Sequence, residues 1–383
     1  MLQTCHNPSF IKKIQKFGYV MSGTIKEDER YFFLHPKIKV ILKHGKNKYT
    51  PLKNLLCAIT AQVFLTAIMI NASTYYGPGL AFGICILLAS TLGAWLMFWS
   101  QALIHHCSHK LTLKPSAYFA ALTADMLFCE SGPCFALYFF KYHMRHHIAV
   151  GSKSDTCIPV HYHWSVVPKT LTRSVLGRLT WLSIVGLFTT ELLIIQNFLL
   201  KFRFIQSDSL LEVYQENCAE FYLTAIFKIV FGLVVFTTFG WVPYLYLRLS
   251  AGFAFGAFAH PFVSFWLIQH AAVKSSNYQP TLSYAGSRWW QRMNAWELLH
   301  VEHHDFPNAS PKDLVQIRQL CRREYESLQQ VTSIRKLIWA WLSLTDGGAW
   351  SDFAAHQYCS NNSSQFNALD RLNGISTFDS YEP

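Results

Sequence analysis

Long apolar stretches alternate with polar segments along this chain. Uncharged residues fill 54–73 and 79–104, and each stretch has about the 20 residues that a helix needs to cross a membrane. The link between them is short and uncharged, which predicts a transmembrane hairpin. A second apolar pair, 221–247 and 249–269, predicts a second hairpin with its turn near the sequence GWVPY.

Two further apolar stretches contain charges and are harder to assign. The stretch 116–140 includes Asp125, and the stretch 173–200 includes Arg178. Charged side chains are costly in lipid, so we interpret both stretches as interfacial or cap helices. A fifth or sixth membrane span is the competing interpretation.

The composition agrees with a membrane protein. Hydrophobic residues make up 51% of the 383 residues and charged residues only 14%, whereas soluble domains carry about 25% charge. Basic residues concentrate outside the apolar stretches, so the positive-inside rule places both termini and the middle loop in the cytosol. Residues 1–20 are polar and basic, unlike a signal peptide.

The net charge of +11 raises the question of nucleic acid binding. Residues 1–53 contain eleven Lys or Arg and three Asp or Glu, but no basic stripe interleaved with stacking aromatics. Such a flank favours an anionic membrane surface over nucleic acid. The ten cysteines are scattered without a C-x-x-C pair, which argues against a disulfide framework or a zinc ribbon.

These patterns divide the chain into three parts. Residues 1–53 form a cytosolic N-terminal region, residues 54–356 form the membrane domain, and residues 357–383 form a polar tail that we expect to be disordered. The predicted fold is all-α, with four transmembrane helices in two hairpins and a cytosolic helical cap.

Histidines supply the candidate chemistry. Nine of the seventeen histidines lie at the predicted cytosolic boundary, in the sequences HHCSH, HMRHH and HVEHH and at the end of the fourth span. They are His105, His109, His143, His146, His147, His270, His300, His303 and His304. Within each sequence the spacing of three or four residues puts these rings on one helix face.

Nine clustered imidazoles would repel one another if protonated, whereas neutral imidazole is a good ligand for iron, copper, nickel or zinc. One zinc ion takes about four ligands, so the number favours two metals with open positions. Soluble di-iron bundles use Glu-x-x-His motifs, and we find only an approximate match around Glu302. A membrane di-metal oxidase is therefore predicted.

The chain resembles the membrane fatty-acyl desaturase and hydroxylase superfamily in these three histidine boxes. The sequence FKYHMRHH, followed by DTCIP, is similar to the second box of sphingolipid Δ4-desaturases, also called dihydroceramide desaturases. The sequence HVEHHDFPN, preceded by TLSYAG, is similar to the third box. The resemblance covers roughly residues 30–345.

The boxes also depart from the superfamily pattern. His106 stands where the first box usually has an acidic residue, and Lys110 follows His109 where the superfamily has Asn. Gln269 stands in place of Glu, and Leu298 and Leu299 in place of Gly-Tyr.

The resemblance implies a di-iron centre that uses O2 to remove hydrogen from a membrane lipid, namely a dihydroceramide-like sphingolipid. It implies an external electron donor such as cytochrome b5, since no flavin or Rossmann fingerprint occurs in the sequence. Asp155, Glu302 and Asp305 are candidates for carboxylates that orient the ligating imidazoles.

Several alternatives stay open at this stage. A lipid C-hydroxylase or a fatty-acyl desaturase would use the same di-iron site, and a non-catalytic metal-binding membrane protein is a more remote possibility. The expected location is the endoplasmic reticulum membrane in a eukaryote or the inner membrane in a bacterium. His260, beside Pro261 within an apolar stretch, is a further histidine of undecided role.

Overall fold

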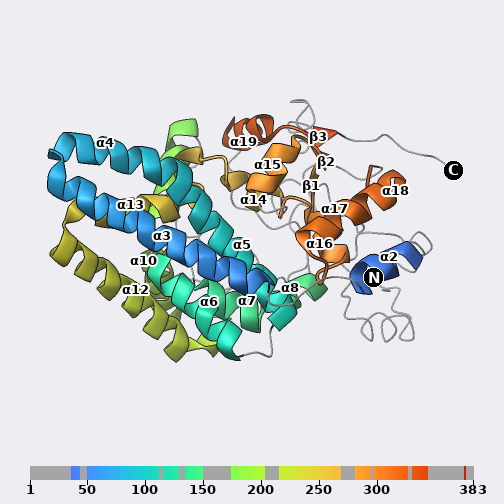
Figure 1. Ribbon diagram of the computed structural model, residues 1–383, viewed down its shortest axis with the longest axis horizontal. Helices are drawn as coiled ribbons and strands as arrows, with labels where there is room; N and C mark the ends of the chain where they lie inside the picture. The colour runs from blue at the N-terminus through green and yellow to red at the C-terminus, as the bar shows by residue number, and fades with distance from the viewer. Residues whose placement is uncertain are drawn as a thin grey trace.

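The computed structural model is α-helical, with long helices gathered at one end and short helices at the other (Figure 1). It describes residues 36–43, 50–111, 115–128, 134–149, 174–202, 215–268, 281–294, 297–326, 330–343 and 375–376. The tail predicted over 357–383 lies outside the described residues, except for Ile375–Ser376.

Four helices in the described part of the chain are long and apolar enough to cross a membrane, which confirms the predicted number. They are α3 (Thr50–Tyr75), the continuous helix Pro78–His109, α10 (Val175–Lys201) and α12 (Cys218–Phe239). The second of these consists of α4 (Pro78–Leu88), a π-helical turn (Ala89–Gly93) and α5 (Ala94–Leu111). The hairpin predicted from 54–73 and 79–104 is therefore confirmed.

The interfacial or cap assignment of 173–200 is wrong, because α10 is one of the four candidate spans. The charged side chains of Arg178 and Glu191 have polar partners within the protein. Arg178 lies near the start of the helix and donates a 2.8 Å hydrogen bond to the carbonyl of Leu342. Glu191 forms an ion pair with Arg248 of α13 (Trp241–Ala254). Charged side chains with partners inside the protein are tolerated in a membrane-spanning helix. The composition of 173–200 alone had argued against a span.

The second hairpin turns where the sequence predicted, but its second arm is shorter than expected. Helix α12 ends at Phe239, and Gly240 turns the chain with a φ of 87°. The predicted continuous span 249–269 is wrong, because α13 ends at Ala254. Gly256, Phe258 and Ala259 all have positive φ around the 3₁₀ turn Ala257–Ala259, so the helix breaks there.

His260 contacts the π-helical turn of the second span. Its ring Nε2 lies 3.1 Å from the carbonyl oxygen of Ser90, within this turn. A π-turn shifts the backbone hydrogen-bond register and is often stabilised by such an outside partner. Gly93 allows α13 to approach closely, since a Cβ there would lie 2.2 Å from Ser250 Oγ. His260 is thus a packing residue of the span.

Short elements form a cap at the other end (Figure 1). The helices are α2 (Pro36–Lys43), α6 (Pro115–Phe128), α7 (Phe135–Lys141), α8 (His143–Ala149), α14 (Val263–Trp266), α15 (Arg288–Met293), α16 (His300–Asp305), α17 (Pro311–Leu320), α18 (Arg322–Glu326) and α19 (Ile334–Ser343). The strands are β1 (Ser283–Tyr284), parallel to β2 (Gln330–Val331), and β3 (Ile375–Ser376), antiparallel to β2. A separate small core, including Ile38, Phe306 and Ile317, joins α2, α16 and α17.

A buried ion pair connects the membrane helices to this end of the molecule. Lys228 of α12 lies 2.9 Å from Asp125 of α6, and both side chains are fully buried. Asp125 also accepts a 3.1 Å hydrogen bond from the amide of Ala136, at the start of α7. One carboxylate therefore connects α6, α7 and α12, just before the segment that carries the second group of histidines.

We expect Lys228→Met to lower the free energy of unfolding by about 3–5 kcal/mol, because it leaves a buried carboxylate without its cation. The double variant Lys228→Met/Asp125→Asn should recover much of that loss, since Asn still accepts from Ala136. Unfolding by SDS in mixed micelles measures both. A single variant as stable as the wild-type protein would contradict the assignment.

Candidate metal centre

Three helices carry the candidate ligands. Helix α5 contributes His105 and His109 from its last turns, after about 30 residues of membrane-spanning helix. Helix α8 contributes three histidines and begins directly after Tyr142, where a φ of −125° separates it from α7. Helix α16 contributes three more. The spacing of three or four residues places the rings of each helix on one side, as expected.

The structure brings eight of the nine predicted ligands together in two groups. The five-histidine cluster consists of His105, His109, His143, His147 and His303. The three-histidine cluster consists of His146, His300 and His304. Within each group one ring nitrogen per residue lies within 4.8 Å of the others. The ninth predicted ligand, His270, lies outside the described residues.

Ring nitrogens face one another across these clusters. Nε2 of His109 lies 2.9 Å from Nε2 of His105 and 3.1 Å from Nε2 of His143. In the second cluster Nε2 of His304 lies 3.0 Å from that of His300. The clusters adjoin, because the rings of His147 and His304 have centroids 4.3 Å apart.

These rings are held as neutral ligands. Burial, and then the neighbouring imidazoles, keep the pKa of His143, His147 and His303 well below its usual range. Neutral imidazole offers a lone pair to a metal, whereas imidazolium does not.

The donor set fits metal ions. Nε2 of His303 is buried and has no hydrogen-bond partner in the described part of the chain, although it lies inside the five-histidine cluster. A neutral imidazole carries only one N–H, so five converging nitrogens cannot all be satisfied by one another. A cation would accept all five lone pairs, and softer divalent metals suit an all-nitrogen set.

Aromatic side chains pack against the histidine clusters. Phe139 of α7 packs against His105 and His143, with ring centroids 5.0 Å apart in each pair. Phe265 of α14 meets the ring of His300 edge-on at 6.3 Å. These contacts exclude water and keep the imidazoles in one orientation.

The acidic residues next to the third box anchor helix α16. Glu302 is fully buried and accepts a hydrogen bond from Ser283 with one oxygen, while the other pairs with Arg318. Tyr325 donates a 3.2 Å hydrogen bond to Asp305. Both were predicted to orient imidazoles, but the contacts of Glu302 go to α17 and β1 instead. The third candidate, Asp155, lies outside the described residues.

Sequence reasoning missed a carboxylate that contacts two imidazoles. Glu297, in the turn before α16, lies 3.1 Å from Nδ1 of His105 and 2.7 Å from Nε2 of His106. Burial opposes its ionisation, but the two imidazoles outweigh burial and hold the pKa of Glu297 well below its usual range. Glu297 precedes His300 by three residues, so the Glu-x-x-His spacing that we sought around Glu302 was present here.

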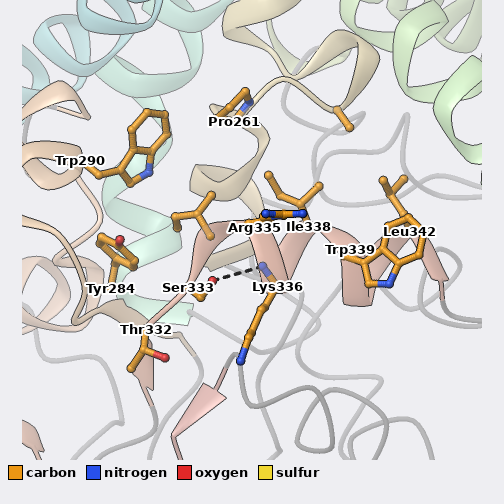
Figure 2. Close-up of a pocket in the computed structure, with 12 residues that line it drawn as sticks. Pro261, Tyr284, Trp290, Thr332, Ser333, Arg335, Lys336, Ile338, Trp339 and Leu342 are labelled. Atoms are coloured by element: carbon orange, nitrogen blue, oxygen red, sulfur yellow. Dashed lines mark hydrogen bonds between the residues drawn. The ribbon is translucent and has the colours of Figure 1, made fainter.

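Two cavities adjoin this part of the molecule. One, of about 470 Å³, touches His106 and His109 and is also lined by Trp99 and Arg292. The other, of about 1190 Å³, lies between α15 and α19 (Figure 2).

Comparison with known proteins identifies the family. The model of the fatty acid desaturase family matches residues 30–335, which is most of the chain. The chain belongs to the fatty acid desaturase family. The predicted family, its oxidoreductase class and its integral membrane class are thereby confirmed. Together with the two histidine clusters, membership supports metal binding and a lipid substrate.

Curated relatives within this desaturase family are distant. A putative sphingolipid delta(4)-desaturase/C4-monooxygenase of Caenorhabditis elegans is 28% identical over 52% of this chain and 48% of its own length. A sphingolipid delta(4)-desaturase/C4-monooxygenase of Mus musculus is 25% identical over 70% of this chain and 78% of its own. A sphingolipid delta(4)-desaturase of Rattus norvegicus is 23% identical over 78% and 81%. No solved structure matches the chain significantly.

We expect the purified desaturase to retain about two metal ions per chain, one for each cluster. His109→Ala and His300→Ala should each lose about half of the metal or more, and the double variant nearly all of it. Elemental analysis of the detergent-solubilised protein measures this. His260→Gln is the matched control, because its ring contacts the carbonyl of Ser90 and the rings of Phe253 and Phe262 rather than either histidine cluster. A double variant with full metal content would contradict the assignment of these clusters.

Proposed function

We propose that this desaturase is a di-iron enzyme that uses O2 to introduce a double bond into the acyl or sphingoid chain of a sphingolipid of the dihydroceramide type. All nine predicted histidines, including His270, are its proposed metal ligands. Lipid C-hydroxylation on the same site is the second candidate, because two of the similar proteins carry both activities in their names.

One observation carries this proposal more than any other. Two adjoining clusters of buried histidines, five and three in number, occur in a chain whose family oxidises hydrocarbon chains. A single structural zinc would need about four ligands in one closed site. Two adjacent all-histidine groups supply a pair of ions with room for exogenous ligands. That combination supports oxidation chemistry over a structural or transport role.

Two bound iron ions would supply O2 activation and the removal of hydrogen from an unactivated methylene. The protein holds the reacting C–C bond beside the clusters and excludes water. The rings of Phe139 and Phe265, packed against ligating imidazoles, provide that dry boundary. Desaturation and hydroxylation differ in whether a second hydrogen leaves or oxygen is added. The position of the chain against the clusters therefore decides the product.

The larger cavity is the proposed site for the lipid chain. It has a volume of about 1190 Å³, which exceeds the usual range for small-molecule pockets. Figure 2 shows Tyr284 and Trp290 on one side, and Ile338 and Trp339 of α19 on the other. Arg335 also lines it, and a cation beside indole rings is typical of the boundary between membrane and water.

A column of aromatic rings connects this cavity to the metal centre. Trp290 stacks on Phe262, with ring centroids 5.7 Å apart. Phe262 stacks on Phe98 at 4.6 Å, and Phe98 meets Phe265 edge-on at 5.2 Å. Phe265 in turn contacts His300. These packed rings connect the lining of the cavity to the three-histidine cluster through apolar side chains alone.

The remaining parts of the proposal concern location and electrons. The clusters lie at the end of α5 that precedes the most basic parts of the chain, so we place them and both termini at the cytosolic face. In a eukaryote the membrane would be that of the endoplasmic reticulum, and in a bacterium the inner membrane. Electrons come from a separate donor, such as cytochrome b5 in a eukaryotic cell.

Expression in cells that make saturated sphingoid bases tests this function. We expect a product lighter by two hydrogens, and no such product from His147→Ala, because that variant removes a ligand between the two clusters. Mass spectrometry of the extracted bases distinguishes the outcomes. A product heavier by one oxygen would assign hydroxylation, and unchanged sphingoid bases would reject the sphingoid chain as the site of reaction.

Ile338→Trp tests the proposed chain cavity. A larger ring at this half-buried position should reduce turnover of long chains at least several-fold and affect short chains less, because it fills space along α19. Product yield across a series of chain lengths measures the effect. Leu176→Trp, on the exposed face of α10, adds the same ring outside the cavity lining and should leave the series unchanged. Equal effects of both variants would reject this cavity.

A further inference from the structure

Two consecutive histidines of α5 contact a single carboxylate. His105 and His106 follow one another, so their side chains diverge by about 100° around the helix axis. Glu297 enters the space between them and is only 2% exposed. Its Oε2 lies 3.1 Å from Nδ1 of His105, and its Oε1 lies 2.7 Å from Nε2 of His106. Each oxygen therefore has its own imidazole.

The two rings use this carboxylate in different ways. His105 is a proposed ligand, and its Nε2 lies 2.9 Å from Nε2 of His109, inside the five-histidine cluster. Its Nδ1 is therefore the outer nitrogen. A hydrogen bond from Nδ1–H to a carboxylate fixes the tautomer and leaves the lone pair on Nε2 directed inward. The ring of His106 is not part of that cluster and reaches Glu297 through its own Nε2.

A buried carboxylate needs partners for both oxygens, because an unpaired buried charge is costly. His105 satisfies only one of them. An acidic side chain at position 106 would place a like charge against Glu297, whereas Nε2 of His106 lies 2.7 Å from its Oε1. The imidazole at position 106 is therefore electrostatically compatible with the carboxylate at position 297, although 191 positions separate them along the chain.

We propose that Glu297 is a positioning residue that orients His105 for metal binding, and that His106 acts on the centre only through Glu297. This inference rests on the proposed function for the identity of the metal. The pair contacts no substrate in this assignment. It sets the direction of one ligand and the ease with which that ligand releases the metal.

Release of Fe2+ from the purified full-length protein to a chelator tests the proposal. Loss of such a supporting carboxylate typically weakens metal binding by about 10–100-fold, so Glu297→Gln should release Fe2+ about that much faster. Glu191→Gln is the control, since it removes a carboxylate that pairs with Arg248 and lies on α10, a helix that carries no proposed ligand. With Co2+ bound in place of Fe2+, this control should leave the ligand-field spectrum unchanged, whereas Glu297→Gln should alter that spectrum. Glu297→Asp, which keeps the charge, should restore part of the slow release.

A double variant tests the link between His106 and Glu297. His106→Ala should release Fe2+ faster than the wild-type protein but more slowly than Glu297→Gln. His106→Ala/Glu297→Gln should be no faster than Glu297→Gln alone, because coupled residues are not additive. His106→Glu should release faster than His106→Ala, owing to repulsion. His106→Ala and His106→Glu keep the test valid if Glu297→Gln does not fold.

Several results would overturn the proposal. One is a folded Glu297→Gln protein that releases Fe2+ at the wild-type rate, and another is additive behaviour of the double variant. A third is loss of one whole ion from His106→Ala with unchanged release of the rest, because the pair would then bind an ion itself. A wild-type protein that retains no Fe2+ overturns both this proposal and the di-iron function. A protein that retains Fe2+ but does not alter sphingoid bases overturns only the proposed substrate.

Discussion

The structure depends on one constraint: eight imidazoles must face one another in the interior of the protein. Burial lowers the pKa of His143, His147 and His303 and keeps these rings uncharged, so their nitrogens have too few protons to satisfy one another. Such an arrangement is unfavourable unless the surrounding structure holds every ring in place. Three short helical segments, α8, α16 and the end of α5, carry the rings, and each is fixed by contacts from outside the clusters.

Buried charges provide many of those contacts. Asp125 connects α6, α7 and α12 through Lys228 and the amide of Ala136, which positions the chain immediately before α8. Glu302 anchors α16 to Ser283 and Arg318. In a low-dielectric interior such pairs are costly to break, although their net contribution to stability is modest. Their effect here is to determine where the histidine-bearing helices lie relative to the membrane spans.

Membership of the desaturase family and the geometry of the clusters address different parts of the function. The family identifies an oxidative enzyme of lipids, whereas the two adjoining histidine groups show where metal ions could be held. Desaturase and hydroxylase chemistry share that centre. In the proposed function, the product depends on how a hydrocarbon chain in the larger cavity approaches the three-histidine cluster.

The sequence by itself determined the local features: the first hairpin, the turn at Gly240, and the histidine faces at spacings of three and four residues. These follow from helix periodicity and apolar length, which neighbouring residues decide. Only the tertiary structure divided the histidines into groups of five and three and brought Glu297 to His105 and His106. It also made α10 a span and broke the helix after Ala254. Whether a charge is paired, and which ring a carboxylate meets, depends on residues distant in sequence, so no local pattern reveals it.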